Sequence, residues 1–188
     1  MFMAPSIPRD IERIIHSLNN SNSVGYDGIA TKILKHVSME ISGHLSHIIN
    51  LSIGAGIYPD ALKMSIIKPL FKKENRELME YYRPISLIPV ISKIFEKYIY
   101  RELSKFIDKH DILCEEQKGF RTHRTINMAI YDFIYEVIKN VDQRNPVCGI
   151  FCDMTQAFDY VHHATLLDKL ESYGIRGNVL NLFNSYLQ

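Results

Sequence analysis

The sequence predicts a helix-rich α+β fold. Apolar residues recur at the three-and-four-residue spacing of amphipathic helices over most of its length, and only short segments have the β-branched, apolar character of strands. The 188 residues are 46% hydrophobic and 23% charged, which is an ordinary globular composition with enough apolar material for a core. The sequence contains no internal repeat and no low-complexity tract.

Helical spacing and helix-breaking residues define the expected helices. The first has apolar residues from Ile7 to Leu18 and ends at an Asn/Ser run, and the third ends at Gly54, Gly56 and Pro59. A turn at residues 25–28 precedes the second helix. The expected helices cover residues 7–18, 29–37, 41–53, 91–106, 126–141, 163–172 and 178–187.

Three segments favour extended structure. Residues 64–71 form a short β-branched strand, and Pro69 predicts that this strand lies at a sheet edge or ends there. Residues 81–89 hold two prolines and are expected to be extended, whereas 72–80 and 115–125 are expected loops. Residues 147–154 predict an apolar strand that ends near Asp153. The one plausible domain boundary is at Pro146, which divides the chain into residues 1–146 and 147–188.

Charge excludes some classes of function. The net charge of +1 excludes a simple basic protein that coats nucleic acid and an acidic disordered tail. Residues 63–105, however, hold ten basic and five acidic residues, which suits a polyanionic partner bound over a limited surface. A solvated lysine-rich surface would give the same pattern.

No membrane partner is expected, and the chain is expected to be intracellular, in the nucleus or the cytoplasm. No apolar run approaches the roughly 18 residues of a membrane span, and the N-terminus lacks the pattern of a signal peptide. The three cysteines are odd in number and are interpreted as reduced thiols.

Asp153 is the strongest candidate for chemistry that the residues alone provide. It follows an apolar segment, and a carboxylate there needs a cation or hydrogen-bond donors. Mg²⁺ prefers such hard oxygen ligands, but an aspartate that caps the next helix is the alternative. A zinc site built from Cys148, Cys152, His162 and His163 is a weaker alternative, because its ligand spacing is unusual and strand cysteines more often belong to a core.

Five sequence blocks, in one order, resemble the reverse transcriptases of non-LTR (LINE-type, jockey-like) retrotransposons. The longest, from Gly149 to His163, reads Gly-Ile-Phe-Cys-Asp-Met-Thr-Gln-Ala-Phe-Asp-Tyr-Val-His-His and is similar to the first catalytic motif of that family. The four upstream blocks are Gly-Tyr-Asp-Gly-Ile at 25–29, Lys-Pro-Leu-Phe-Lys-Lys at 68–73, Tyr-Arg-Pro-Ile-Ser-Leu at 82–87 with Ser-Lys-Ile-Phe-Glu-Lys at 92–97, and Gln-Lys-Gly-Phe-Arg at 117–121.

The resemblance implies the N-terminal part of a right-hand polymerase. Residues 1–146 would be a fingers-like region with N-terminal helices, and 147–188 would begin the palm. The implied reaction is nucleotidyl transfer from a dNTP to a primer 3′-hydroxyl on an RNA template, with two metal ions. The implied partners are an RNA template, a DNA primer and a dNTP, whereas the oligomeric state stays open.

The resemblance also assigns roles to single residues. Asp153 would bind a metal ion, close to the backbone carbonyl of Met154, and Phe158 would exclude the ribose 2′-hydroxyl. Asp159 is expected only to make local hydrogen bonds. Arg83 and Lys93 would face the dNTP triphosphate, although both could simply be solvated surface charges. Weaker candidates are Arg121 for the dNTP or template phosphate, and Lys72 and Lys73 for the template backbone.

The family's second carboxylate motif, a Tyr/Phe-x-Asp-Asp hairpin, does not follow Asp153 in this sequence. Mg²⁺ or Mn²⁺ is therefore expected only together with downstream carboxylates, and the chain is expected to be inactive alone. It is either a fragment of a working polymerase, truncated before the catalytic hairpin, or an inactive remnant that could serve as a nucleic-acid-binding or interaction module.

Overall fold

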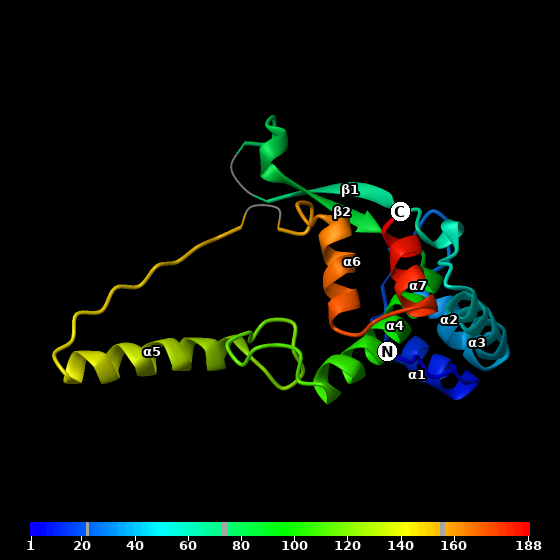
Figure 1. Cartoon of the computed structure of the whole chain (residues 1–188). Coiled ribbons are helices and arrows are strands. Elements are labelled where there is room, and N and C mark those ends of the chain that lie inside the picture. Colours follow the sequence, from blue (N-terminus) through cyan, green and yellow to red (C-terminus); the bar gives the residue numbers. More distant parts are fainter. Residues whose placement is uncertain (22, 73–74, 155–156) are drawn as a thin grey trace. The chain divides into compact units, whose positions relative to one another are not determined.

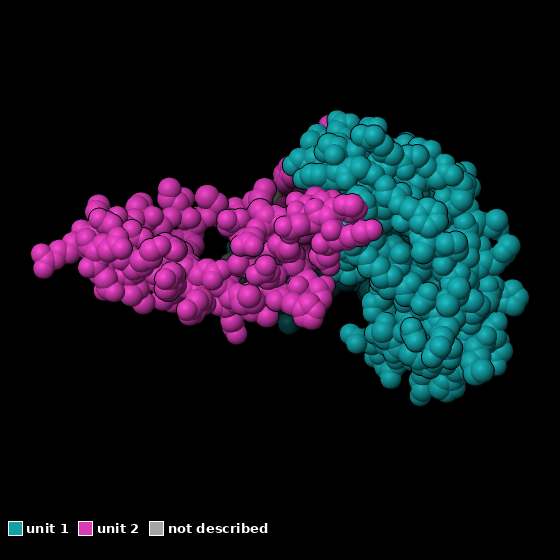
Figure 2. All heavy atoms as spheres, turned by 60° about the horizontal axis from the view of Figure 1, so that its bottom comes forward, with its two compact units in different colours: residues 1–106, 163–188 teal, residues 107–162 magenta. Residues whose placement is uncertain are grey.

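A computed structural model describes residues 1–21, 23–72, 75–154 and 157–188. These residues form two compact units, coloured separately in Figure 2: residues 1–106 with 163–188, and residues 107–162. The compact units divide the chain after residues 106 and 162, not at Pro146. The expected boundary at Pro146 separates a fingers-like region from the start of the palm, which is a different division, and it stays a prediction. Over these described residues, the structure confirms a helix-rich α+β architecture with one small sheet.

The first unit is built mainly from helices (Figure 1). Its core contains Ile11, Ile15, Ile94, Phe95 and Tyr98, each at most 1% exposed. Ile11 and Ile15 recur at helical spacing on one helix, and Ile94, Phe95 and Tyr98 do so on another, so each set shares one face of its helix. The helix α1 packs against α3, and α7 packs against both α3 and α6. The helices of this unit are α1 (Pro8–Ser17), α2 (Thr31–His36), α3 (Ser38–Ala55), α6 (His163–Ser172), α7 (Asn178–Leu187) and all but the last three residues of α4 (Val90–Lys109).

A two-stranded antiparallel sheet joins the N-terminal helices to α4. Strand β1 (Ile66–Phe71) pairs with β2 (Tyr82–Leu87), with Ile66 opposite Leu87 and Phe71 opposite Tyr82. Both strands are edges, which explains why Pro69 and Pro84 are tolerated opposite each other without breaking the pairing. The expected strand at 64–71 and the extended segment at 81–89 are confirmed.

The turn at residues 25–28 packs against the backbone that leads into α4. The Gly28 amide donates to the Gly25 carbonyl (3.2 Å), and Gly28 has a φ of 69°, a conformation that favours glycine. A Cβ on Gly25 would lie 2.6 Å from the Pro89 nitrogen and 2.9 Å from the Ile88 carbonyl carbon. Gly25 is therefore required for the close approach that fixes the connection between β2 and α4.

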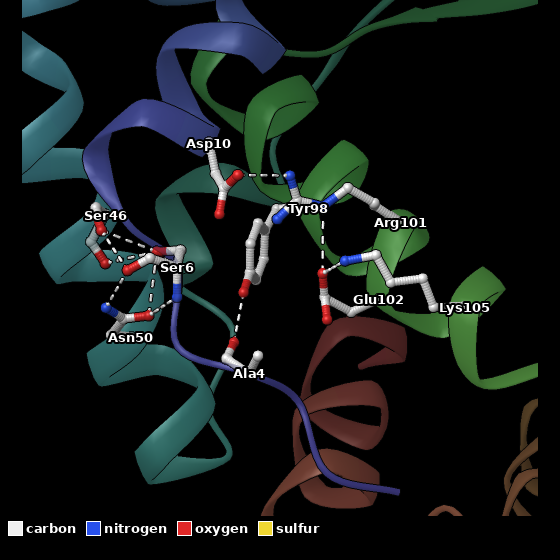
Figure 3. A network of polar contacts seen from close by, with 9 residues as sticks. All are labelled: Ala4, Ser6, Asp10, Ser46, Asn50, Tyr98, Arg101, Glu102 and Lys105. Atoms are coloured by element: carbon white, nitrogen blue, oxygen red, sulfur yellow. Dashed lines mark hydrogen bonds and ion pairs between the residues drawn. The ribbon is translucent and has the colours of Figure 1, made fainter.

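Two polar networks hold the N-terminal segment in place (Figure 3). On α4, Arg101 bonds Asp10 of α1 (3.2 Å) and Glu102 (3.2 Å), and Lys105 also bonds Glu102 (2.7 Å). Towards α3, the Ser6 amide donates to the Asn50 side chain (2.7 Å), and the hydroxyls of Ser6 and Ser46 lie 3.0 Å apart. One network connects the segment that precedes α1 with α3, and the other connects α1 with α4. Together they help to position the N-terminal helices against α4, the helix that contains Lys93.

The second unit contains the helix α5 (Ile126–Asp142), which begins where the Thr125 hydroxyl accepts from the Met128 amide (3.3 Å). The helix ends at Asp142, three residues before the expected break at Asn145-Pro146. The expected helix is thus confirmed, but its apolar face is exposed to solvent. Ile130, Phe133, Ile134 and Ile138 are each 45–54% exposed.

The strand expected at residues 147–154 does not form. The backbone there has no regular structure, and within the described residues the only sheet is the β1–β2 pair. A strand needs a neighbouring strand for its backbone hydrogen bonds, and none of the described segments pairs with this one. Cys148 and Cys152 are consequently exposed, not part of a core.

Candidate nucleotide and nucleic-acid site

Arg83 and Lys72 lie on the same face of the hairpin. Arg83 is exposed on β2 opposite Leu70. Lys72 follows β1, and its amide donates to the Tyr81 carbonyl (2.8 Å), which continues the register by one pair. Because paired residues point to the same face and successive residues alternate, Leu70, Lys72 and Arg83 share a face. Lys73 lies outside the described residues.

Lys68 is a further cation of this face that sequence reasoning missed. It is exposed on β1 opposite Ile85, so it lies on the Arg83 side of the hairpin. Its signal was the two-residue period of Lys68, Leu70 and Lys72, which places both lysines on one face of a strand. In the part of the chain that the structure describes, no ion pair involves Lys68, Lys72 or Arg83.

Lys93 stands in the first turn of α4, and its amide donates to the Pro89 carbonyl (3.2 Å). Its side chain is half-buried beside Glu96, one turn along the helix. Burial raises the pKa of the Glu96 carboxyl, whereas a hydrogen bond from Tyr186 (2.9 Å) and the Lys93 charge act to lower it. Lys93 therefore stabilises a neighbouring carboxylate within the first unit, whatever its part in binding phosphate.

Asp153 and Met154 are exposed in the irregular segment of the second unit. Among the described residues, no ion pair involves Asp153. No three His, Cys, Asp or Glu side chains of those residues gather closely enough to hold a metal ion. Asp153 nevertheless fits as a single metal ligand, because Mg²⁺ takes one or two protein carboxylates together with phosphate oxygens and water.

Phe158 contacts the loop that precedes α5. Its ring meets that of Phe120 edge-on, with centroids 6.0 Å apart at 83°. Phe120 has a φ of 57°, an uncommon conformation for a bulky residue, and 86% of its surface is exposed. The contact joins the block at 117–121 to the segment after Asp153, two blocks that are far apart in the sequence.

Arg121 holds its own loop. Its Nη1 donates to the carbonyls of Cys114 (2.7 Å) and Leu113 (3.4 Å). The guanidinium has five N–H donors, so this contact occupies only part of it. Asp159 lies in an exposed turn, where the Val161 amide donates to the Phe158 carbonyl (3.4 Å).

No helix among the described residues is long and apolar enough to cross a membrane.

Comparison with known proteins gives one consistent family. A family model described as "Reverse transcriptase (RNA-dependent DNA polymerase)" matches residues 71–188. The chain is 27% identical to the probable RNA-directed DNA polymerase from transposon X-element of Drosophila melanogaster, over 100% of this chain and 21% of that protein.

Two further Drosophila melanogaster proteins give similar values. The probable RNA-directed DNA polymerase from transposon BS is 28% identical over 89% of this chain and 19% of its own length. The RNA-directed DNA polymerase from mobile element jockey is 26% identical over 85% of this chain and 18% of its own. The chain thus spans about a fifth of the length of these relatives.

Proposed function

Because the chain belongs to the reverse transcriptase (RNA-dependent DNA polymerase) family, in its non-LTR, jockey-like branch, we propose that it forms the fingers and the beginning of the palm of such an enzyme. The supporting observation is the family match over 71–188, a stretch that contains β2 with Arg83, α4 with Lys93, and Asp153. Residues 1–146 would be the fingers-like region, and 147–188 would open the palm.

The reaction that we propose for the whole enzyme is addition of a dNTP to a primer 3′-hydroxyl on an RNA template. The hydroxyl oxygen would form a bond to the α-phosphorus as the bond between that phosphorus and the α,β-bridging oxygen breaks, so that pyrophosphate leaves and the hydroxyl proton passes to water. Arg83 and Lys93 would bind the triphosphate, the first as a bidentate guanidinium and the second as a point charge. Phosphate binding of this kind orients the α-phosphate for attack and offsets the charge on the leaving group.

Asp153 would hold a divalent cation, Mg²⁺ or Mn²⁺, together with the Met154 carbonyl and carboxylates from elsewhere in the enzyme. Such an ion polarises phosphoryl oxygens and lowers the pKa of a bound hydroxyl. The exposed Asp153 carboxylate suits this role, because it can approach both the ion and the substrate. Phe158 would fill the space next to the sugar C2′ and so select dNTPs over rNTPs.

The reaction is tested by primer extension with the full-length polypeptide that contains this chain. We expect DNA synthesis that requires an RNA template annealed to a primer, dNTPs and Mg²⁺. Omission of the template is the control. A folded full-length polypeptide that extends no primer with either Mg²⁺ or Mn²⁺ would contradict the proposal.

A further inference from the structure

Two lysines of α4 line one hollow of about 300 Å³ in the first unit, and only one of them is used by the fold. Lys97 donates from its Nζ to the Ser17 carbonyl (3.3 Å) and to the Ser17 hydroxyl (3.0 Å), so it holds the C-terminal end of α1. Among the described residues, the Lys93 side chain makes no hydrogen bond and no ion pair. The donors of its ammonium are therefore free to bind phosphate oxygens.

Glu96 lies between this hollow and an apolar one. It lines the hollow that contains Lys93, and it also lines a second hollow of about 320 Å³ whose walls are mainly apolar side chains of α4, α6 and α7. There the Tyr186 hydroxyl of α7 donates to Glu96 Oε1 (2.9 Å). The Tyr186 ring meets the buried Tyr58 edge-on, with centroids 4.8 Å apart, and the Ser185 hydroxyl accepts from the Tyr58 amide (3.0 Å). The hydrogen bond to Glu96 thus comes from an anchored part of α7.

The fold does not require the negative charge of Glu96. The side chain is half-buried, burial raises the pKa of its carboxyl, and no ion pair among the described residues offsets this cost directly. A glutamine could accept the same hydrogen bond from Tyr186 through its amide oxygen, without a buried charge. A charge that costs stability and that no contact of the fold needs is typical of a residue that serves a functional site.

Lys93 is the cation whose charge acts on Glu96. The two residues are three apart on α4, which places them on the same face of the helix, and they line the same hollow. The Lys93 charge acts to lower the pKa of the Glu96 carboxyl, and the attraction is mutual. A lysine side chain loses rotamer freedom when it is ordered, so a fixed carboxylate that attracts its ammonium reduces what binding must order.

We propose that Glu96 is a positioning residue for the dNTP triphosphate. Its carboxylate, oriented by the Tyr186 hydroxyl, keeps the Lys93 ammonium in the shared hollow while leaving the donors of that ammonium free for phosphate. The inference rests on the proposed function, in which Lys93 binds the triphosphate, and extends it to α7. Glu96 and Tyr186 act through Lys93 and do not touch the substrate.

The test is the affinity of the 188-residue chain for dATP with Mg²⁺, measured by isothermal titration calorimetry. We expect Glu96→Gln to weaken dATP binding about fivefold and Tyr186→Phe to weaken it about twofold, because each change loosens Lys93. By charge alone, loss of a carboxylate would strengthen the binding of an anion, so the sign of the effect separates positioning from charge.

Two variants are matched controls and should bind dATP as wild type does. Glu171→Gln is an equal change of charge at an exposed position on α6. Tyr100→Phe removes a phenol that lines the same hollow as Lys93 and makes no hydrogen bond to a described residue.

A double-mutant cycle shows whether Glu96 acts through Lys93. We expect Lys93→Gln to weaken dATP binding about tenfold, and Glu96→Gln in that background to weaken it no further. In the full-length polypeptide, Glu96→Gln should raise the KM for the dNTP about fivefold and leave kcat unchanged. A merely structural role of Glu96 would not produce this dependence on Lys93.

Unchanged or tighter dATP binding by folded Glu96→Gln would overturn the proposal, and so would an equal effect of Glu96→Gln with and without Lys93. A wild-type chain that binds no dATP would also overturn it, and primer extension would still decide the reaction. Coupling between Glu96 and Lys93 in a chain whose full-length form extends no primer would uphold the inference and contradict the proposed reaction alone.

Discussion

At the scale of single residues, the carboxyl of Glu96 links the fold to a candidate site residue. It accepts a hydrogen bond from Tyr186 (2.9 Å) and lies near Lys93, yet burial still raises its pKa. Burial also raises the pKa of Tyr186, to about 12, so the phenol stays protonated and remains a donor at neutral pH. Any variant of Lys93 therefore disturbs this carboxylate as well as any bound phosphate.

The raised pKa of Glu96 makes stability depend on pH in a defined direction. Between the ordinary glutamate pKa, about 4.3, and the raised value, the folded state binds more protons than the unfolded state, so this group's contribution to stability falls as pH rises. We expect the stability gained by Glu96→Gln relative to wild type to increase as pH rises through this window. Urea unfolding at a series of pH values measures the difference. Glu171→Gln, at an exposed position on α6, is the control, and an equal pH dependence in both variants would contradict the assignment to Glu96.

At the scale of elements, the turn at residues 25–28 determines where α4 begins. A Cβ at Gly25 would lie within 3 Å of three backbone atoms of Ile88 and Pro89, and backbone cannot yield as the end of a side chain can. We expect Gly25→Ala to lower the free energy of unfolding by about 1–3 kcal/mol.

Gly43→Ala is the matched control for this glycine. Gly43 lies within α3, nothing is within 4 Å of its added Cβ, and alanine there should stabilise the helix by about 0.5–1 kcal/mol. Thermal unfolding of both variants gives the comparison. A Gly25→Ala protein as stable as wild type would show that the turn does not need this close approach.

The helices could be predicted from the sequence because their signals are local. Ile11 and Ile15 recur at helical spacing and become core residues, and the expected segments at 163–172 and 178–187 coincide with α6 and α7. Strands depend on partners that spacing does not identify. The sequence does not show that Leu70 pairs with Arg83, so it could not predict that Lys68 and Arg83 lie on the same face of the hairpin. The strand at 147–154 was wrong for the same reason, because no described segment pairs with it.

At the scale of the whole molecule, the near-zero net charge conceals an uneven distribution. The excess of basic residues in 63–105 includes the exposed Lys68, Lys72 and Arg83 of one hairpin face, together with Lys93 on α4. Asp153, for which we propose metal binding, belongs to the second compact unit, residues 107–162. The sequence motif identified it, although its segment forms neither a helix nor a strand. Sequence motifs located these residues, whereas only the register revealed how the hairpin cations are grouped.

The central claim is that Asp153 is a catalytic carboxylate of a reverse transcriptase, and primer extension by the full-length polypeptide tests it most directly. Rates on an RNA template with Mg²⁺ are compared for wild type, Asp153→Asn and the control Asp168→Asn, which removes an exposed carboxylate on α6. We predict that Asp153→Asn lowers the rate by at least about 100-fold, because a metal ligand matters at least as much as the groups that orient it, and that Asp168→Asn retains wild-type activity. Wild-type rates for Asp153→Asn would contradict the account.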